Sequence, residues 1–454
     1  VVCLESDLQD GQMKEVDVGR HSVLLTRCEG KYSAIGNQCT HYGAPLSKGF
    51  FSGNKLRCPW HGSCFNVLTG DLEEFPGMDS LPCHKVKIEN KKVYVSECVV
   101  FVCVCCLKDS TRLVFLHFVV FNSFLGAASL TCAETLRQEN FGGRIIMVTR
   151  EDLLPYDKTR LSKVMNVSSD TIMLRSMEFF HQYDIEVWLR KEALSVDMDK
   201  KMVTFDDGTV QNYDQLLLST GCRAKGLDLP GMKLDNVKML ETPEDMLLEK
   251  DVRFHMIDSV TEIRGMNGKV KEVVLKSGKV IPTDVLIVGI GEYNSLNKVN
   301  EPVYVPLLQC MRTNVPDVFC AGDMAFFPLT IAKNQLVNIG HWQMAQAQGK
   351  IAALNMLNKA TELTSIPFYW TVLLNKTIRY AGYGEGYTEI VMKGQFQFEE
   401  RKFLALYIKD DEVIAAVGLN YDPVVSAVAE RLLSGKVITK EEAQSDDPSW
   451  LQVS

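Results

Sequence analysis

The sequence predicts a multidomain protein with an all-β N-terminal domain, an α/β region in the middle and an α+β domain at the C-terminus. Three observations support this fold class. Residues 1–97 hold short β-type runs separated by turn signals such as Asn90-Lys91. From about residue 115, apolar strand-like runs alternate with helix-like stretches, which is typical of a parallel sheet. Residues 365–454 combine two strand-like runs with an amphipathic helix.

The individual elements follow from these patterns. In the N-terminal domain we expect strands at residues 22–25, 32–35, 55–57, 86–88 and 93–95, with a loop-rich return at 71–82. In the middle region we expect strands at 115–121, 144–149 and 318–321, helices at 133–138 and 342–358, and a hairpin followed by an apolar strand within 270–288. In the C-terminal domain we expect strands at 404–408 and 413–419 and a helix at 424–433.

Composition excludes several classes of protein. A net charge of −8 argues against a nucleic-acid footprint. The most apolar stretch, residues 98–125, is interrupted by charges at 108–112, and neither half reaches the ~18 residues of a membrane span. We expect buried strands or an ill-fitting junction there. Fourteen cysteines in 454 residues indicate reducing conditions, and Cys98 and Cys103 are better explained as buried strand residues than as a redox dithiol.

One pattern points to redox chemistry. Cys39 and His41 form a C-x-H pair, and sixteen residues later Cys58 and His61 form a C-x-x-H pair. Two thiolates and two imidazoles can hold a [2Fe-2S] cluster, with the cysteines on one iron and the histidines on the other. A structural zinc site is the alternative, but zinc fingers usually pair Cys with Cys and His with His. The sequence therefore predicts an iron–sulfur centre that transfers electrons.

Three later segments supply groups that a flavin cofactor needs. They are residues 155–163, 213–221 and 318–323, in the order used by FAD-dependent pyridine-nucleotide reductases. Lys158 and Lys163 are cations able to pair with pyrophosphate or with the N5–O4 edge of the flavin. Thr220-Gly221 ends a strand with a residue that lets backbone approach the cofactor. Asp323 is suited to accept hydrogen bonds from a ribityl hydroxyl.

With these motifs, nearly the whole chain resembles the Rieske-containing, apoptosis-inducing-factor-like proteins, in which a Rieske domain is fused to a ferredoxin-reductase-type flavoprotein. The resemblance continues through residues 340–349, 367–370 and 378–386. It implies that Trp342 and Trp370 lie beside the isoalloxazine and that Ala193 offers backbone to the adenine end of FAD. Core packing is the alternative for both tryptophans. The resemblance also implies a Rieske domain at 1–97, a junction at 98–116, a discontinuous FAD-binding domain at 117–247 and 291–360, a remnant of an NAD-binding domain at 248–290 and a C-terminal interface domain at 361–454.

Two departures from the family pattern affect the nucleotide sites. The phosphate loop should read G-x-G-x-x-G/A, but Phe124, Gly126 and Ser129 occupy these positions, so only the middle glycine remains. For the acidic residue on the adenine ribose we choose Glu151 over Arg150.

The second departure is a deletion. After residues 241–245 the second Rossmann unit, with its own glycine loop for NAD(P)H, is missing, and residues 289–294 do not match the nicotinamide-side motif. A splice form, an unusual gene model and a diverged paralogue would each explain this. We expect FAD binding to be weakened and NAD(P)H binding to be lost.

The cluster loops also predict a low reduction potential. Ala44 and Trp60 stand where respiratory Rieske proteins carry a disulfide. Ser63 can keep one hydrogen bond to a cluster sulfur, whereas Phe65 has no hydroxyl to donate. Because fewer donors disfavour the reduced form, oxygenase-type ferredoxin behaviour is expected.

The first functional hypothesis is an electron-transfer oxidoreductase, in which electrons pass from NAD(P)H through FAD and the cluster to an unknown acceptor, with turnover impaired in this chain. No acid–base or nucleophilic catalytic residue is implied. The alternative is a non-enzymatic, pro-apoptotic signalling or scaffold protein that carries the cluster. A Rieske oxygenase is weaker, since its two-His, one-carboxylate iron site has no matching pattern. We expect a possible homodimer in a mitochondrial or cytoplasmic location. The chain starts at Val1 rather than Met, which we interpret as a truncated N-terminus.

Overall fold

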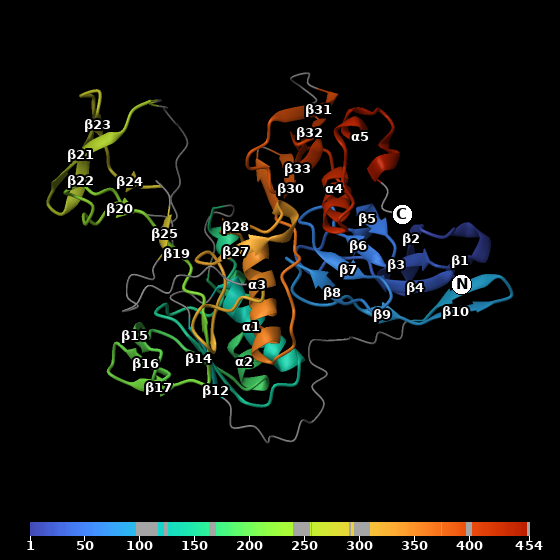
Figure 1. Cartoon of the computed structure of the whole chain (residues 1–454), viewed down its shortest axis with the longest axis horizontal. Coiled ribbons are helices and arrows are strands. Elements are labelled where there is room, and N and C mark those ends of the chain that lie inside the picture. The colour runs from blue at the N-terminus through green and yellow to red at the C-terminus, as the bar shows by residue number, and fades with distance from the viewer. Residues whose placement is uncertain are drawn as a thin grey trace.

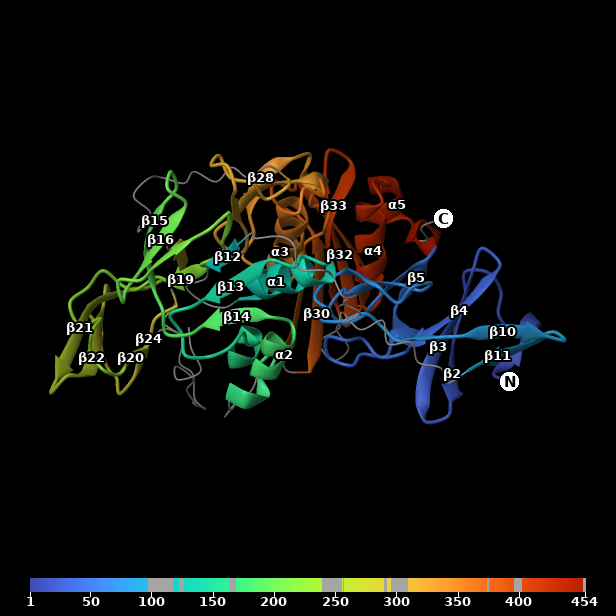
Figure 2. The same cartoon turned by 90° about the horizontal axis from the view of Figure 1, so that it is seen from below.

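The computed structural model describes residues 1–96, 117–121, 126–162, 169–238, 255, 257–289, 292–294, 309–373, 375–395 and 402–451. Figures 1 and 2 show the N-terminal domain beside the C-terminal domain, with segment 257–289 at the opposite end of the molecule. The expected junction at 98–116, which includes Cys98 and Cys103, and Lys163 lie outside the described residues. Among the described residues, no helix is long and apolar enough to cross a membrane.

Small antiparallel sheets build the N-terminal domain. Its strands are β1 (Cys3–Leu4), β2 (Met13–Val18), β3 (His21–Cys28), β4 (Lys31–Gly36), β5 (Phe50–Ser52), β6 (Lys55–Arg57), β7 (Cys64–Asn66), β8 (Leu72–Glu74), β9 (Cys83–His84), β10 (Val86–Glu89) and β11 (Lys92–Val95). They form sheets of order β2-β3-β4-β9, β5-β6-β7-β8 and β1-β11-β10. The five expected strands are present. The loop expected at 71–82 was too long, because Leu72–Glu74 pairs with β7 as a strand.

A five-stranded parallel sheet forms the central domain. In spatial order its strands are β14 (Ile185–Trp188), β13 (Arg144–Val148), β12 (His117–Phe121), β18 (Gln215–Leu218) and β26 (Val318–Cys320). All neighbouring pairs are parallel, and the strand order is that of a doubly wound nucleotide-binding fold. Such folds bind ligands outside the carboxyl ends of their strands, so site residues should follow β13, β18 and β26.

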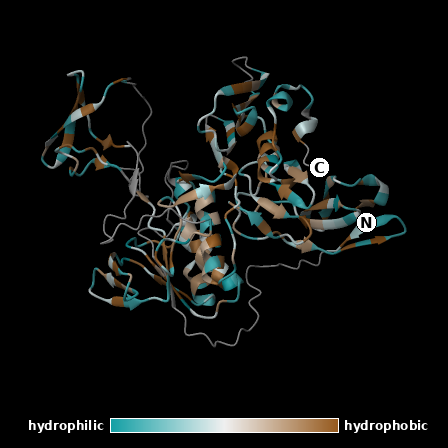
Figure 3. Ribbon diagram, viewed as in Figure 1, coloured by the Kyte–Doolittle hydropathy of each residue, from teal (hydrophilic) through white to brown (hydrophobic). Residues whose placement is uncertain are grey.

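Two helices pack together over this sheet. They are α1 (Ala127–Gln138) and α3 (Trp342–Met356), whose apolar residues lie at the centre of the molecule in Figure 3. The helix expected at 133–138 begins earlier, because Gly126 serves as its N-cap and two alanines continue the first turn. A Cβ on Gly349 would lie 2.2 Å from the carbonyl oxygen of Ala128, so only glycine allows α3 to approach α1 this closely.

Several smaller sheets surround the central one. Segment 257–289 forms the antiparallel sheet β21 (Val260–Met266), β22 (Lys269–Leu275) and β23 (Val280–Pro282) around its own small core of Ile263, Val270 and Val273. The strand expected over 280–288 is interrupted after Pro282, since proline cannot donate a ladder hydrogen bond, and the chain resumes as β24 (Leu286–Ile287). The remaining strands are β15 (Ala193–Asp197), β16 (Met202–Phe205), β17 (Val210–Asn212), β19 (Cys222–Ala224), β20 (Val237–Lys238), β25 (Glu292–Asn294), β27 (Phe326–Leu329) and β28 (Gln335–Asn338), and α2 is Met177–Gln182.

The C-terminal domain is an α+β unit. Its sheet has the order β29 (Phe368–Leu373), β30 (Lys376–Gly382), β33 (Glu412–Leu419), β32 (Lys402–Lys409) and β31 (Glu389–Gln395). Helix α4 (Val424–Leu433) packs on this sheet, and α5 (Lys440–Gln444) follows. The expected strands at 404–408 and 413–419 and the expected helix at 424–433 are therefore confirmed. The predicted fold class, all-β then α/β then α+β, is also confirmed.

Candidate redox centre

Two tight loops of the N-terminal domain carry the predicted metal ligands. Cys39 and His41 follow β4, and Cys58 and His61 lie between β6 and β7. In each loop the cysteine carbonyl accepts a hydrogen bond from a glycine four residues on, at 2.9 Å from Gly43 N and 3.3 Å from Gly62 N. Both glycines have positive φ, 72° and 79°, which other residues rarely adopt. The turns therefore aim all four side chains inward.

The two cysteines are held as a buried pair. Their exposed fractions are 3% for Cys39 and 0% for Cys58. A hydrogen bond with Cys58 lowers the pKa of Cys39 to about 7, and the same bond, together with burial, raises the pKa of Cys58. One thiol of the pair is therefore prepared to become the thiolate that metal binding requires.

The two histidines form the second pair. Their Nδ1 atoms lie 2.8 Å apart. Burial lowers the pKa of His41 to about 4, and burial together with the charges of His41 and Arg379 lowers the pKa of His61 to about 2. Both imidazoles are therefore neutral at pH 7, the form that coordinates metal through nitrogen.

This donor set fits a [2Fe-2S] cluster better than a single zinc ion. The donors fall into one sulfur pair and one nitrogen pair, as two irons with two protein ligands each would need. The Ser63 hydroxyl is fully buried beside Cys39, and its hydrogen bond helps to lower the pKa of that thiol, so it is placed to donate to a sulfur at this site.

Aromatic side chains from the rest of the chain cover the histidine pair. The Trp370 ring on β29 lies 4.9 Å from the ring of His61, 5.7 Å from that of His41 and 4.9 Å from that of His341, measured between centroids. A Cβ on Gly62 would lie 2.7 Å from the Phe368 ring, so the second cluster loop is pressed against the C-terminal domain. The histidines therefore face the flavoprotein half of the chain.

A buried charge cluster fixes the N-terminal domain to α4. The Arg57 guanidinium is 1% exposed and lies 3.0 Å from the Glu74 carboxylate and 2.5 Å from the Glu430 carboxylate. Arg57 also donates to the carbonyl of Gly62 at 2.8 Å. At the start of α4, the Ser426 hydroxyl donates to the carbonyl of Cys58 at 3.3 Å. These contacts orient the second cluster loop.

A second set of contacts joins the first cluster loop to the central domain. Arg175 pairs with Asp79 at 2.9 Å and with Glu134 of α1 at 2.7 Å. The Tyr42 hydroxyl donates to Asp157, and its ring stacks on His41 with centroids 4.1 Å apart. The N-terminal domain is thus held from two sides.

The predicted flavin-end residues come together at the carboxyl edge of the parallel sheet. Thr220 and Gly221 follow β18, and Asp323 follows β26. A Cβ on Gly221 would lie 3.9 Å from Asp323 Oδ2, and a Cβ on Gly340 would lie 3.6 Å from Asp323 Oδ1. Trp342 begins α3 two residues after Gly340. This grouping is where a doubly wound fold binds its ligand.

The predicted adenine-end residues form a second group. Glu151 follows β13, and its carboxylate lies 3.9 Å from Lys158 Nζ. The Arg190 backbone N–H donates to the Glu151 carbonyl at 2.9 Å. The segment that leads into β15, which begins at Ala193, therefore runs beside Glu151. Gly126 is the N-cap of α1, and the N-terminus of a helix is a position at which proteins commonly bind phosphate. Lys163 and the phosphate-loop residues 122–125 lie outside the described residues.

Several residues at this centre were not selected from the sequence. Tyr42 and His341 are each adjacent to a selected residue, so proximity in sequence was a usable signal. Phe368 and Arg379 belong to segments 367–370 and 378–386, which carry the family resemblance, but their place on the sheet face that meets the second cluster loop follows from the packing and register of β29 and β30.

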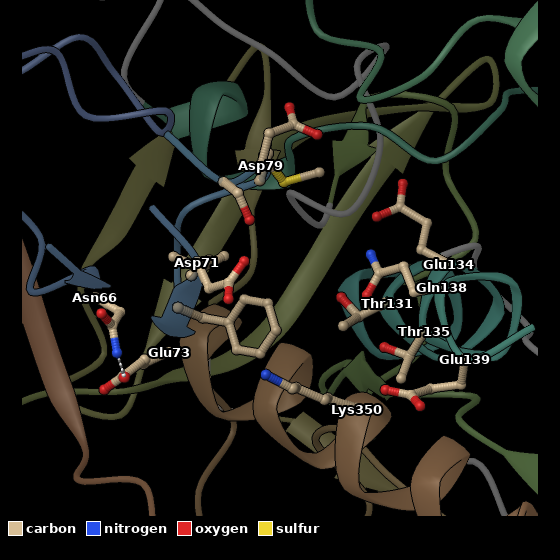
Figure 4. Close-up of a pocket in the computed structure, with 14 residues that line it drawn as sticks. Asn66, Asp71, Glu73, Asp79, Thr131, Glu134, Thr135, Gln138, Glu139 and Lys350 are labelled. Atoms are coloured by element: carbon tan, nitrogen blue, oxygen red, sulfur yellow. Dashed lines mark hydrogen bonds between the residues drawn. The ribbon is translucent and has the colours of Figure 1, made fainter. Parts of the chain in front are cut away.

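A cavity of about 530 Å³ opens between the N-terminal domain and helices α1 and α3, as Figure 4 shows. Carboxylates line both of its sides, and burial lowers the pKa of the one lysine that faces them. None of the predicted ligand or flavin residues lines it. Its charged lining residues are Asp71, Glu73, Asp79, Glu134, Glu139 and Lys350.

This fold and site define a class of protein, a flavin-dependent reductase joined to a Rieske iron–sulfur domain. Family models match in the same order: "Rieske [2Fe-2S] domain" at residues 1–85, "Pyridine nucleotide-disulphide oxidoreductase" at 125–248 and 238–349, and "Reductase C-terminal" at 368–452. Apoptosis-inducing factor 3 of Homo sapiens is 40% identical over 532 residues, covering 99% of this chain and 87% of the relative. The chain belongs to the family of Rieske-containing, apoptosis-inducing-factor-like oxidoreductases.

More distant relatives share the reductase part. Rubredoxin-NAD(+) reductase of Pseudomonas putida is 25% identical and covers 65% of this chain and 94% of the relative. The solved complex of putidaredoxin reductase with putidaredoxin has a TM-score of 0.65 at 19% identity, covering 73% of this chain and 96% of that one, which supports the fold. Together with the Rieske match, these relatives support an electron-transfer oxidoreductase, and the matched domains imply a [2Fe-2S] cluster and FAD.

The comparison with the human relative also bears on the deletion. The alignment extends over 532 positions, whereas this chain has 454 residues, so the relative holds additional residues inside the aligned region. The reductase match is divided into two parts that meet at residues 238–248, where the sequence predicted the missing segment.

Proposed function

We propose that this protein transfers electrons internally, from a flavin in its central domain to the metal centre of its N-terminal domain. A bound FAD would supply chemistry that converts two-electron into one-electron transfer, and a [2Fe-2S] cluster held by Cys39, His41, Cys58 and His61 would supply a one-electron acceptor. The observation that supports this most directly is the position of Trp370, which contacts both predicted histidine ligands on one side and His341 at the start of α3 on the other. The Trp370 ring thus links the predicted ligand histidines to the start of α3.

Each group of residues has a task in this proposal. The four N-terminal donors hold the cluster. The ion pairs of Arg57 and Arg175 with carboxylates of neighbouring elements keep the N-terminal domain docked on the rest of the chain. Thr220, Gly221 and Asp323 hold the ribityl and ring end of the flavin, with Trp342 and Trp370 beside the ring. The residues proposed for the adenine and pyrophosphate end are Gly126, Glu151, Lys158, Lys163 and Ala193.

We also propose that the nicotinamide half of the reaction is impaired. The missing Rossmann unit removes the glycine loop on which NAD(P)H pyrophosphate would rest, and the FAD loop keeps one glycine of three. The rubredoxin and ferredoxin reductases among the relatives are named for separate iron proteins. Here the fused Rieske domain fills that place, so the first electron acceptor belongs to the chain and the final acceptor is a separate molecule.

The test is a cofactor analysis followed by two reductions. Purified protein should contain two irons and two acid-labile sulfides, with flavin at or below one per chain. Photoreduction of the flavin should bleach the cluster absorbance and produce a reduced-cluster EPR signal, whereas NADH should do neither at a comparable rate. Zinc in place of iron, or a cluster that stays oxidised while the flavin is reduced, would contradict the proposal.

A second function is favoured by one observation, the name of the human relative, Apoptosis-inducing factor 3. A protein with only a signalling or scaffold role would carry the cluster but no flavin. Iron and sulfide with no flavin in protein that was refolded or purified with excess FAD would therefore favour this alternative.

A further inference from the structure

Arg379 of the C-terminal domain is placed toward the cluster loops. It lies on β30 directly opposite Trp370 of β29 in the strand register, and directly opposed residues share one face of a sheet. On that face the Trp370 ring contacts His41 and His61. Arg379 is 3% exposed, although it belongs to a domain more than 300 residues away from the ligands in sequence.

The charge of Arg379 is only partly balanced. Its Nε lies 3.6 Å from the carboxylate of Asp422, which is itself 24% exposed. Nη1 donates to the carbonyls of Thr371 and Ile378 at 3.3 and 3.0 Å, and within the described residues Nε has no hydrogen-bond partner. A buried guanidinium with one distant, part-exposed counterion projects a positive field into its surroundings.

The cluster loops pack against the same face of the sheet. Phe368 and Trp370 are two residues apart on β29 and so share the face that carries Arg379. A Cβ on Gly62 of the second cluster loop would lie 2.7 Å from the Phe368 ring, and the Trp370 ring contacts both predicted histidine ligands. The field of the arginine is therefore directed at the site where the cluster would be bound.

We propose that Arg379 is a positioning residue that raises the reduction potential of the docked Rieske cluster. With two thiolates, two neutral imidazoles, two sulfides and two ferric irons, the oxidised cluster is neutral, and one added electron makes its charge −1. A fixed cation stabilises the −1 state, so the equilibrium moves toward the reduced cluster and no bond or proton changes place. This rests on the proposed function only in requiring that a cluster is bound. It adds that the flavoprotein half tunes the potential of the metal centre that it reduces.

The experiment is a redox titration of the cluster in the full-length protein, followed by EPR and visible absorbance. Arg379→Gln should lower the equilibrium constant for reduction about tenfold, which for one electron corresponds to a potential about 59 mV more negative. Arg379→Lys keeps the charge and should retain most of the potential. Arg431→Gln is the matched control, because Arg431 also pairs with a carboxylate of this domain, Glu442, but reaches Val437 rather than the cluster loops. It should leave the potential unchanged.

A variant of opposite sign separates charge from packing. Asp422→Asn removes the counterion of Arg379 and should move the potential in the positive direction. If Arg379 only held the domains together, Arg379→Gln would open the site to water, which favours the charged reduced form and would raise the potential instead. Thermal unfolding of each variant reports whether the docking survives, and where Arg379→Gln does not fold, Arg379→Lys and Asp422→Asn decide the question.

The outcomes distinguish this inference from the proposed function. An unchanged or raised potential in folded Arg379→Gln, with iron and sulfide intact, overturns the tuning role alone. Protein with zinc or without metal overturns the proposed function, and the tuning role with it.

Discussion

At the scale of single residues, Trp370 connects more of the proposed redox path than any other side chain described at the site. Its ring contacts two histidines of the N-terminal domain and His341 at the start of α3, so three separately built parts of the chain meet on one indole. A large, rigid aromatic side chain fills such a junction at little cost in conformational entropy, since it has only two rotatable side-chain bonds. All three histidines are neutral at pH 7, because burial lowers the pKa of each imidazole.

Replacing Trp370 by Leu should slow electron arrival at the cluster while leaving the cluster in place. The smaller side chain breaks the packed contact, and a misplacement of about 1 Å in a reacting pair costs up to about 10²-fold, so a loss of about tenfold or more is expected. Flash photoreduction of the flavin, followed by cluster absorbance, measures the rate. Trp188→Leu is the control, because Trp188 packs against Phe205 in the central domain. Equal rates in the parent and Trp370→Leu proteins would remove this residue from the path.

The ligand histidines predict the pH dependence of the metal-free protein. Their pKa values are lowered to about 4 and about 2 in the folded state, whereas in the unfolded state both titrate near the ordinary value of about 6.5. Between these values the unfolded chain binds more protons, so stability falls as the pH is lowered from about 6.5 toward 4. Thermal unfolding of the apo-protein across this range measures the effect. His61→Asn should flatten the profile, and an unaltered slope would show that other groups dominate.

At the scale of elements, the buried cluster of Arg57, Glu74 and Glu430 links β6, β8 and α4, which belong to two domains. Two carboxylates that share one guanidinium in a buried site depend on that cation, because burial penalises each unpaired charge. Burial raises the pKa of Glu74 even with the arginine present. The interface is therefore specified by charge pairing in addition to apolar contact.

Arg57→Met should destabilise the docked N-terminal domain by about 3–5 kcal/mol, since it removes the guanidinium that two buried carboxylates share. Chemical denaturation followed by cluster absorbance gives the change. Arg264→Met provides the contrast, because Arg264 pairs with Glu262 and Glu272 on an exposed sheet, where solvent screens the charges and the pairs contribute little to stability. Similar losses in both variants would show that the buried cluster has no special role in docking.

The elements also show how far the sequence could be interpreted. Strands and helices with clear periodicity, such as α4 and β32, were predicted closely because one face of each packs on the domain core. The ligand motif was equally local, since a metal site needs its donors at fixed spacing. Element ends decided by single residues were missed, as at Gly126 and Pro282. The contacts of Phe368 and Arg379 were not predictable, because they depend on how distant domains dock.

At the scale of the whole molecule, the described core is divided among the domains. Separate buried clusters lie in the N-terminal, central and C-terminal domains and in segment 257–289. Both views place that segment at the end of the molecule away from the N-terminal domain (Figures 1 and 2). It also exposes apolar side chains, among them Met266 at 61% and Ile287 at 54%. A domain fragment that has lost its other half would leave such a surface.

Removing residues 226–290, which include segment 257–289, should therefore leave the redox centre intact. Ala224 and Glu292 are cross-strand partners in the antiparallel pair β19 and β25, so a short Gly-Ser linker in place of residues 226–290 has only to close a hairpin. Because the fragment has its own core, we expect the cluster absorbance and the unfolding midpoint of the remaining domains to match those of the parent within a few degrees, about 1 kcal/mol. A shortened protein that lost the cluster would show instead that the fragment still supports the central domain, and its exposed apolar face would then need a structural explanation.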